Sequence, residues 1–274
     1  MAVADIQRLK ELLQNGSVKS ALIVLPQNPD LDQVAAGLSL SMILSKKGVG
    51  STVSCPSSMV VEFNRLVGVQ RVREDLGDKN LVISFAEYPA DDIERVSYNI
   101  ENGSFTLSVI PKPGKIGPQQ DQVIISHAGS AANTVFVIGA NYPNDLGSFA
   151  QTKEILEQPN LCLVANKPLS GWPRAIELID TNVSSISEVI FEIAQELGVE
   201  IDQDEATNLF LGLEDGTRNF TDKAVNSQTF SAASQLLQRG AQRKQAQQQG
   251  QQQKRRQDLP ADYSPQVRDG SNLG

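Results

Sequence analysis

The apolar residues of this 274-residue chain fall into two alternating patterns, short continuous runs and longer runs with a helical period. The run at 21–25 is rich in β-branched residues and turn residues at 26–30 end it, which predicts a buried strand. From Leu31 the apolar residues recur every three or four positions to about Ile43, which predicts a helix. A central strand therefore leads through a short acidic loop onto a helix N-terminus, where Asp30 or Asp32 is placed to cap the helix.

The same two patterns continue along the chain. Further strands are predicted at 50–55, 80–85, 134–138 and 161–164, the strand at 80–85 as another buried one. Helices are predicted at 4–15, 146–156, 184–197, 204–213 and 229–237, with a helical turn at 60–67 and a loop at 166–180. Strands that alternate with helices are typical of right-handed parallel crossovers. The predicted fold class is α/β, with a parallel, doubly wound sheet and a helical C-terminal part.

An insertion interrupts this pattern at about 94–125. Apolar and polar residues alternate there on either side of Glu101-Asn102-Gly103, which is a hairpin signal. A cluster of Pro and Gly residues between 111 and 118 predicts a second turn. We therefore expect an antiparallel β-hairpin insertion within one α/β domain that spans residues 1–241.

Residues 242–274 have a different composition. The segment is Gln-rich, nearly free of large apolar residues and interrupted by Gly and Pro, so it buries too little surface to offset its ordering entropy, and we expect a disordered tail. The stretch from Arg239 to Arg256 is basic, with no acid before Asp258. It could contact RNA, lipid or an acidic protein face, or it could be a solvated, solubilising tail.

Charge and composition narrow the function classes. The net charge of −8 argues against a general affinity for nucleic acid or anionic membrane. No apolar run approaches 18 residues, and the N-terminus lacks the basic start and apolar middle of a signal peptide, so we expect a cytoplasmic protein. Cys55 and Cys162 lie in apolar, strand-like runs, which favours buried reduced thiols.

The acidic loop resembles a known motif. The stretch NPDLDQVAAGLSLSMILSKKG is similar to the first motif of the DHH phosphoesterase superfamily, His-x-x-Pro-Asp-x-Asp followed by a small-residue helix. Pro29, Asp30 and Asp32 match, whereas Pro26 stands in the histidine position. The resemblance covers most of residues 18–241. It implies a DHH-like fold and, in typical members, a site for two divalent ions, usually manganese.

The second and fourth motifs match in their scaffold and differ at their acidic positions. In VFVIGANYPNDLG, Leu146-Gly147 match, but Gly139 stands in the aspartate position. In GLEDGTRNF, Thr217 and Phe220 match, but Gly216 stands in the aspartate position, next to Asp215. The resemblance thus implies that the fold is kept while metal-binding side chains are missing.

The third motif, Asp-His-His, aligns with Ala165-Asn166-Lys167. The single histidine of the chain, His127, lies outside every motif, and a pair of dications needs several carboxylate and imidazole ligands. Lys167 could occupy the space of a cation and hold Asp30 or Asp32 by charge. In typical members a smaller C-terminal domain holds the substrate phosphate, whereas in this sequence the Gln-rich segment follows, so we expect this half of the usual site to be missing.

Two functions follow from these residues. The first is a catalytically inactive homologue, a pseudoenzyme without a cofactor, that binds a protein partner or a small phosphate-bearing, nucleotide-like ligand. The second is an active phosphodiesterase or phosphatase that uses Asp30 and Asp32, with Asp215 as a further candidate ligand, around one Mg²⁺ or Mn²⁺. Neither involves a membrane, RNA contact through the tail is a weaker expectation, and the sequence leaves a homo-oligomer open. The remnant metal-motif positions are Asp30, Asp32, Gly139, Ala165, Asn166, Lys167 and Gly216, and the candidate ligand-binding residues are Asn28, Asp30, Asp32, Lys167, Asp215, Thr217 and Arg218.

The tail composition generates a prediction. Limited proteolysis should leave a stable core that ends near Gly240, because the segment beyond it has almost nothing that could pack. A chain truncated there should melt at the same temperature as the full chain. A clearly lower melting temperature would show that the tail contributes to the folded core.

Overall fold

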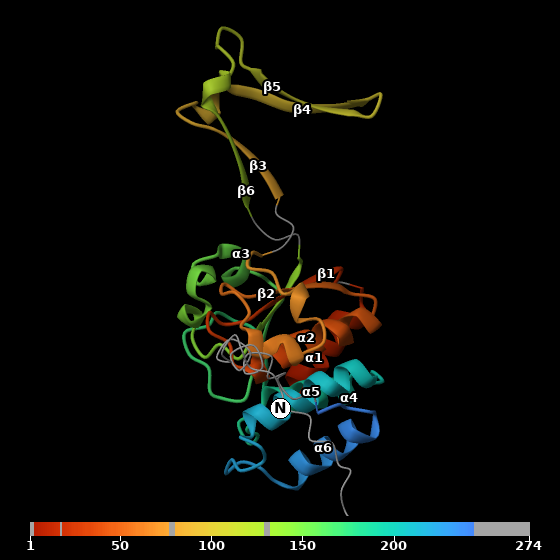
Figure 1. Cartoon of the computed structure of the whole chain (residues 1–274). Coiled ribbons are helices and arrows are strands. Elements are labelled where there is room, and N and C mark those ends of the chain that lie inside the picture. Colours follow the sequence, from red (N-terminus) through yellow and green to blue (C-terminus); the bar gives the residue numbers. More distant parts are fainter. Residues whose placement is uncertain (1–2, 17, 77–79, 129–131, 244–274) are drawn as a thin grey trace, which may run out of the picture.

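A five-stranded parallel sheet forms the centre of the computed structural model, which describes residues 3–16, 18–76, 80–128 and 132–243. Its strands lie in the order β2-β1-β7-β8-β9, and every neighbouring pair is parallel (Figure 1). Their bounds are β1 (Ser20–Val24), β2 (Gly50–Ser54), β7 (Thr134–Ile138), β8 (Leu161–Ala165) and β9 (Ile176–Ile179). The predicted parallel α/β sheet is confirmed.

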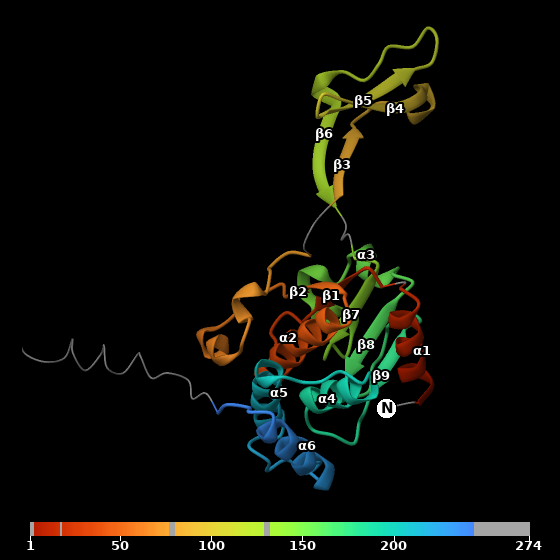
Figure 2. The same ribbon diagram turned by 90° about the vertical axis from the view of Figure 1, so that its right-hand side faces the viewer.

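Alternate residues of the three central strands, β1, β7 and β8, enter two separate cores. Ile23 and Phe136 face a large cluster, while Leu22 and Val135 face a smaller one, which explains why the strands are apolar without alternation. The large cluster is covered by α2 (Leu31–Lys46), α4 (Ile186–Glu196) and α5 (Gln203–Gly216), with α6 (Ser227–Gln238) outside them and α1 (Val3–Gln14) beside β9 (Figure 2). The smaller cluster is covered by the short helices η5 (Pro143–Phe149) and α3 (Lys153–Leu156).

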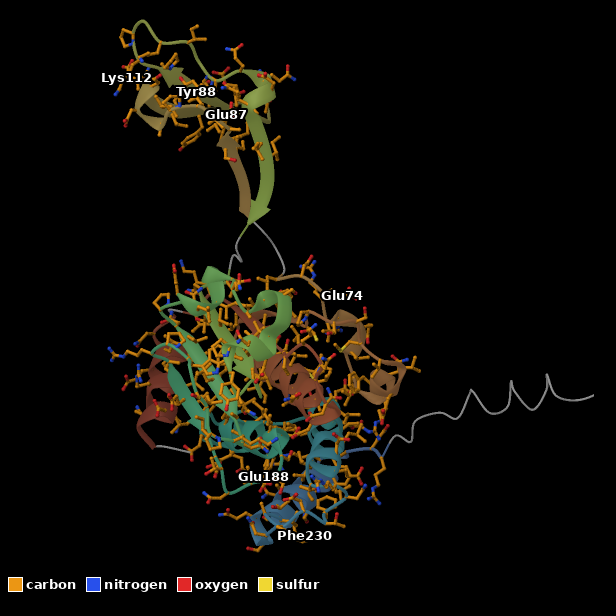
Figure 3. The ribbon with its side chains drawn as sticks, turned by 90° about the vertical axis from the view of Figure 1, so that its left-hand side faces the viewer. Glu74, Glu87, Tyr88, Lys112, Glu188 and Phe230 are labelled. Atoms are coloured by element: carbon orange, nitrogen blue, oxygen red, sulfur yellow. The ribbon has the colours of Figure 1, made fainter. Side chains whose placement is uncertain are left out.

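The insertion forms an arm of two antiparallel strand pairs. In the arm, β3 (Asn80–Phe85) pairs with β6 (Val123–Ala128), and β4 (Ile93–Glu101) pairs with β5 (Ser104–Pro111). Both views show the arm extending away from the body, and Glu87, Tyr88 and Lys112 lie on it (Figure 3). Asn102 and Gly103 have φ angles of 51° and 77°, as a tight hairpin turn requires, so the predicted hairpin is confirmed.

Three details of the predicted elements are wrong. The run at 80–85 was expected as a buried strand, but it forms β3 of the arm, where Ile83 is 37% exposed, because an apolar run alone does not tell which sheet a strand joins. The expected loop at 166–180 contains β9, whose four residues are too few for a clear pattern. The expected helix at 146–156 is split between η5 and α3, with residues 150–152 between them, and Gly147 with its positive φ of 55° interrupts η5 itself.

The remaining short elements are four 3₁₀ helices, namely η1 (Val61–Arg65), η2 (Val69–Arg71), η3 (Ala90–Asp92) and η4 (Gln120–Gln122). The first of them takes the place of the predicted helical turn. Cys55 and Cys162 are free and buried, as expected. Within the described parts of the chain, no helix has the length and apolar character needed to cross a membrane.

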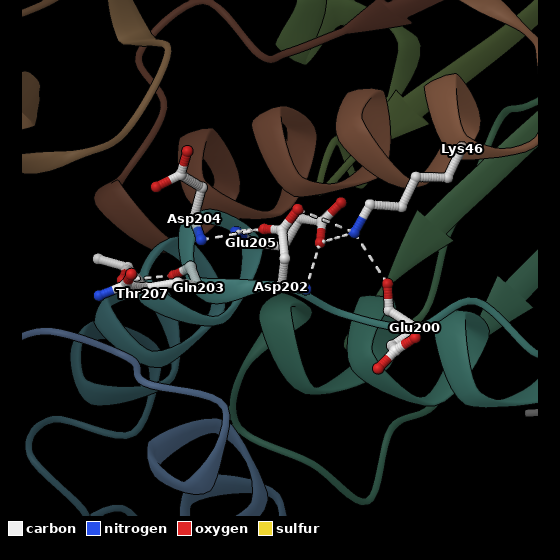
Figure 4. A network of polar contacts seen from close by, with 7 residues as sticks. All are labelled: Lys46, Glu200, Asp202, Gln203, Asp204, Glu205 and Thr207. Atoms are coloured by element: carbon white, nitrogen blue, oxygen red, sulfur yellow. Dashed lines mark hydrogen bonds and ion pairs between the residues drawn. The ribbon is translucent and has the colours of Figure 1, made fainter.

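An ion-pair network joins the end of α2 to the start of α5. The ammonium of Lys46 donates a hydrogen bond to the carbonyl of Glu200 at 2.8 Å, lies 3.1 Å from a carboxylate oxygen of Asp202, and pairs with Glu205 (Figure 4). Glu205 is 1% exposed, so its carboxylate depends on this partner. Asp202 in turn caps α5 by accepting hydrogen bonds from the backbone of Asp204 and Glu205.

This network generates a prediction. Lys46→Met should lower the free energy of unfolding by about 2 kcal/mol, because the buried Glu205 carboxylate would lose its cation while the Lys46 side chain is partly exposed. Urea unfolding at neutral pH measures the difference. The exposed neighbour provides a matched control: Lys47→Met should change stability by less than about 0.5 kcal/mol. Equal effects of the two variants would contradict the prediction.

Candidate functional site

Asp30 caps α2 at the carboxyl end of β1. Its carboxylate accepts a hydrogen bond from the Gln33 backbone at 2.8 Å, and its own backbone N–H donates to the Gln33 side chain at 2.9 Å, which is a complete capping box. Restricted hydration raises the pKa of Asp30, while the hydrogen bond from Gln33 and the charge of Lys167 lower it. Asp30 therefore lies close enough to Lys167 to be affected by its charge.

Asp32 has a different environment, since it is 3% exposed. Its two carboxylate oxygens accept hydrogen bonds from the Ser185 hydroxyl at 2.9 Å, the Ile186 backbone at 2.6 Å and the Ser187 backbone at 2.9 Å. These donors belong to the first turn of α4, where the helix dipole favours an anion. Burial nevertheless raises the pKa of Asp32 to about 7, opposed by the Ser187 hydrogen bonds and assisted by the charge of Asp30.

The glycines at the two missing aspartate positions have little room for a side chain. A Cβ on Gly216 would lie 2.5 Å from a carboxylate oxygen of Asp32. Gly139 has a φ of +67°, and a Cβ there would lie 2.7 Å from the Gln33 side-chain nitrogen. That nitrogen already donates to the Gly139 carbonyl at 3.0 Å. Asp32 and Gln33 therefore fill the space into which aspartates at these positions would project.

The third motif lies at the end of β8. Ala165 is the last residue of the strand and is buried, Asn166 is half-buried, and Lys167 is exposed. The Ala165 carbonyl accepts a hydrogen bond from the backbone of Asp180, so it holds the end of β9. Asn28 lies in the neighbouring loop after β1 and is exposed. The loops after β1, β7 and β8 meet at one edge of the sheet, because parallel strands share that edge.

Shortly after the end of α5, three consecutive residues have a left-handed backbone conformation. Arg218, Asn219 and Phe220 have φ angles of 51°, 56° and 63°, a conformation that costs roughly 1–2 kcal/mol for each residue with a Cβ. The Thr217 hydroxyl holds them, because it donates to the Leu213 carbonyl at 2.5 Å and accepts from the Phe220 backbone at 3.0 Å. Thr217 is fully buried in this role, so its hydroxyl stabilises the turn.

Asp215 is the third carboxylate of this edge. Restricted hydration and the negative charge of Asp30 raise its pKa, while a hydrogen bond from the Asp32 backbone and the charge of Arg65 lower it. The structure thus brings Asp30, Asp32 and Asp215 together, with Lys167 near Asp30. Within the described ranges, no group of three or more His, Cys, Asp or Glu side chains is arranged to hold a metal ion.

Two features of the site were not predicted from the sequence. Gln33 links the helix cap to the end of β7, and the spacing Asp-x-x-Gln could have indicated the capping box. Gly212 is the second feature, since a Cβ there would lie 2.0 Å from the Ser187 hydroxyl oxygen and 2.9 Å from Asp32. This glycine lets α5 approach the start of α4, and only the folded structure reveals that contact.

Glu188 is a second buried carboxylate with a raised pKa. It lies on α4, is 8% exposed, and one of its oxygens has no hydrogen-bond partner among the described residues (Figure 3). Burial raises its pKa to about 7, a hydrogen bond with Thr229 lowers it, and the charges of Asp180 and Glu192 raise it.

A separate pocket of about 530 Å³ lies between α2, β2 and α5. It is lined by Arg73 and by the ion-pair network around Lys46.

Two solved structures are similar to this one. The structure is similar to an exopolyphosphatase-related protein from Bacteroides fragilis, with a TM-score of 0.61 and 15% identity over 88% of this chain and 59% of that one. A putative family II inorganic pyrophosphatase from Methanococcus jannaschii matches with a TM-score of 0.47 and 14% identity over 85% and 60% of the two chains. No protein-family model and no curated protein matches the sequence.

The first of these likenesses shows that the chain shares the fold of the exopolyphosphatase-related protein. The chain spans about three fifths of the length of either protein. At this level of identity the likeness concerns the fold alone, so the activity has to be argued from the site.

Glu188 generates a prediction for pH dependence. Its pKa is raised in the folded state from 4.5 to about 7, so the folded protein binds an extra proton between these values, and its stability should fall as pH rises through that window. Glu188→Gln should remove this contribution. The variant should exceed wild type by about 1–3 kcal/mol at pH 8 and by almost nothing at pH 4.

Urea unfolding between pH 4 and 8 measures the difference. The exposed Glu157 supplies a matched control, since Glu157→Gln should follow wild type at every pH. A pH-independent difference between wild type and Glu188→Gln would mean that Glu188 titrates like an exposed carboxyl.

Proposed function

We propose that this protein is a catalytically inactive homologue of the DHH phosphoesterases that works by binding. The observation that carries the proposal is that the Asp32 carboxylate is buried and hydrogen-bonded within the fold. Both of its carboxylate oxygens accept hydrogen bonds from the first turn of α4, and its side chain is almost completely buried. A carboxylate with its lone pairs engaged in this way is a structural anchor, because binding a cation would require breaking buried hydrogen bonds.

The residues at the site do not fit a pair of divalent ions. Two dications need several hard oxygen and imidazole ligands to offset desolvation and mutual repulsion. Gly139, Ala165 and Gly216 contribute no side-chain ligand, and the Gln33 amide occupies the space beside Gly139. Besides Asp32, the candidate ligand carboxylates are Asp30 and Asp215, and Asp30 also caps a helix.

The binding function has two candidate partner classes, a protein and a small nucleotide-like ligand that bears phosphate. The exposed cations Lys167 and Arg218 favour an anionic ligand, and the loops after β1 and β8 are where an open α/β sheet binds ligands. Asn28 and Asp215 would supply polar contacts in such a site. A cytoplasmic location and an RNA contact through the basic tail remain expectations from the sequence.

The alternative is a hydrolase with one Mg²⁺ or Mn²⁺ held by Asp30, Asp215 and a rearranged Asp32. It is supported by the electrostatic coupling of the three carboxylates, since the charge of Asp30 raises the pKa of both of the others. Mutual repulsion of this kind is relieved by a bound cation. The two functions therefore differ in one measurable property, the affinity of this edge for a divalent ion.

We predict that manganese leaves the melting temperature of the protein unchanged relative to EDTA, because a ligand stabilises a fold only when a real site exists. We also expect no manganese-dependent hydrolysis of short oligonucleotides, cyclic dinucleotides or 3′-phosphoadenosine 5′-phosphate. Asp91→Asn in the arm serves as a charge-matched control. A manganese-induced rise in melting temperature, or turnover, that Asp30→Asn abolishes and Asp91→Asn keeps would establish the alternative.

A further inference from the structure

The β4–β5 hairpin of the arm has one entirely apolar face. Side chains that alternate along a strand share a face, and directly paired residues lie on the same side. The register pairs Val96 with Val109, Tyr98 with Leu107 and Ile100 with Phe105. All six of these side chains are apolar, and the rings of Tyr98 and Phe105 stack with their centroids 6.0 Å apart.

The opposite face of the hairpin is polar. Its paired residues along the outer part are Ser97 with Ser108, Asn99 with Thr106, and Glu101 with Ser104. Polar and apolar positions therefore alternate from Val96 to Glu101 and from Ser104 to Val109, as in strands with one buried and one solvated face. Such a pattern is typical of a sheet whose apolar face packs against another part of the protein or against a partner.

The structure leaves this apolar face uncovered. Tyr98 is 71% exposed, Ile100 65% and Phe105 64%. Together with Val96 and Leu107 they present on the order of 500 Å² of apolar surface, the size of the largest patches on monomers, which are often functional. An isolated two-stranded hairpin is at best marginally stable in water, so the face gains stability when something packs against it.

We propose that a second copy of this chain covers the face, and that the two arms pack together around a twofold axis. The patch is self-complementary, because it is a nearly flat array of aromatic and branched side chains, and an isologous contact presents the same patch from both subunits. The six paired side chains carry no charge, so the net charge of −8 is not brought into the contact.

Other exposed apolar residues of the arm add to the area of this face. A standard interface buries about 800 Å² on each partner. In the second strand pair of the arm, Ile83 lies opposite Ile125, with 37% and 64% of their surfaces exposed. Ile116 in the connecting loop is 79% exposed. These residues extend the apolar surface of the arm towards the size of a stable dimer interface.

The charge of the arm argues against a lipid surface or a nucleic acid as the occupant. Residues 80–128 contain six acidic and three basic side chains, so the arm is repelled by anionic lipids and phosphates. An uncharged protein face is the better match, and the apolar hairpin face of a second copy is such a face.

Sedimentation velocity of the full chain tests the proposal over about 1–50 µM protein. Wild type should form a dimer in this range, and Tyr98→Thr with Phe105→Thr should weaken dimerisation at least tenfold, because large aromatic side chains dominate interface energies. Both residues are exposed in one chain and Thr favours strands, so the fold should be kept, as circular dichroism verifies. Ser97→Thr with Asn99→Thr alters the polar face and should leave the dimer unchanged.

Cysteine cross-linking gives an independent readout. Leu107→Cys should form a disulfide-linked dimer under mild oxidation and Asn99→Cys should not, while the native Cys55 and Cys162 are buried and do not compete. A wild type that stays monomeric at about 50 µM overturns the proposal. So does a dimer that survives the Tyr98 and Phe105 substitutions, or a monomer that sediments with phosphatidylcholine vesicles through its arm.

Discussion

The hydrogen bonds between the Asp32 carboxylate and the first turn of α4 are the interaction on which the candidate site depends. They tie the helix after β1 to a helix that begins more than half the chain later. Gly212 and Gly216 on α5 approach the same carboxylate from the other side. One buried carboxyl group therefore contacts three helices that pack over the large core, and the chemistry of this edge follows from that packing.

Several residues that match the DHH motif pattern in the sequence are ones that the fold itself requires. Leu146 and Phe220 pack into or against the two cores, and Thr217 closes the end of α5, so each is required by the fold. Gly139 and Gly216 stand where the pattern has ligands, and neighbouring side chains have filled the space. Asp32 is retained, and its hydrogen bonds give it a structural role independent of any cation.

The fold was predictable to the extent that local pattern decides it. The apolar runs of β1, β7 and β8 and the helical period of α2 and α4 gave the parallel sheet and its helices, and Asn102-Gly103 gave the hairpin. The placement of β3 in the arm was not predictable, since an apolar run carries no information about its pairing partner. At the site, the acidic residues could be named from the sequence, but the burial of Asp32 and the bridge through Gln33 depend on tertiary contacts.

The strand order has a consequence for how the molecule is made. β1 pairs with β7 at the centre of the sheet, with Ala21 opposite Thr134, and the entire arm lies between them in the chain. Closing so long a loop costs conformational entropy, and this cost is incurred before the contacts between β1 and β7 can offset it. During synthesis β1 therefore has to wait until the arm has left the ribosome, and the exposed apolar hairpin is available to other chains before the body has folded.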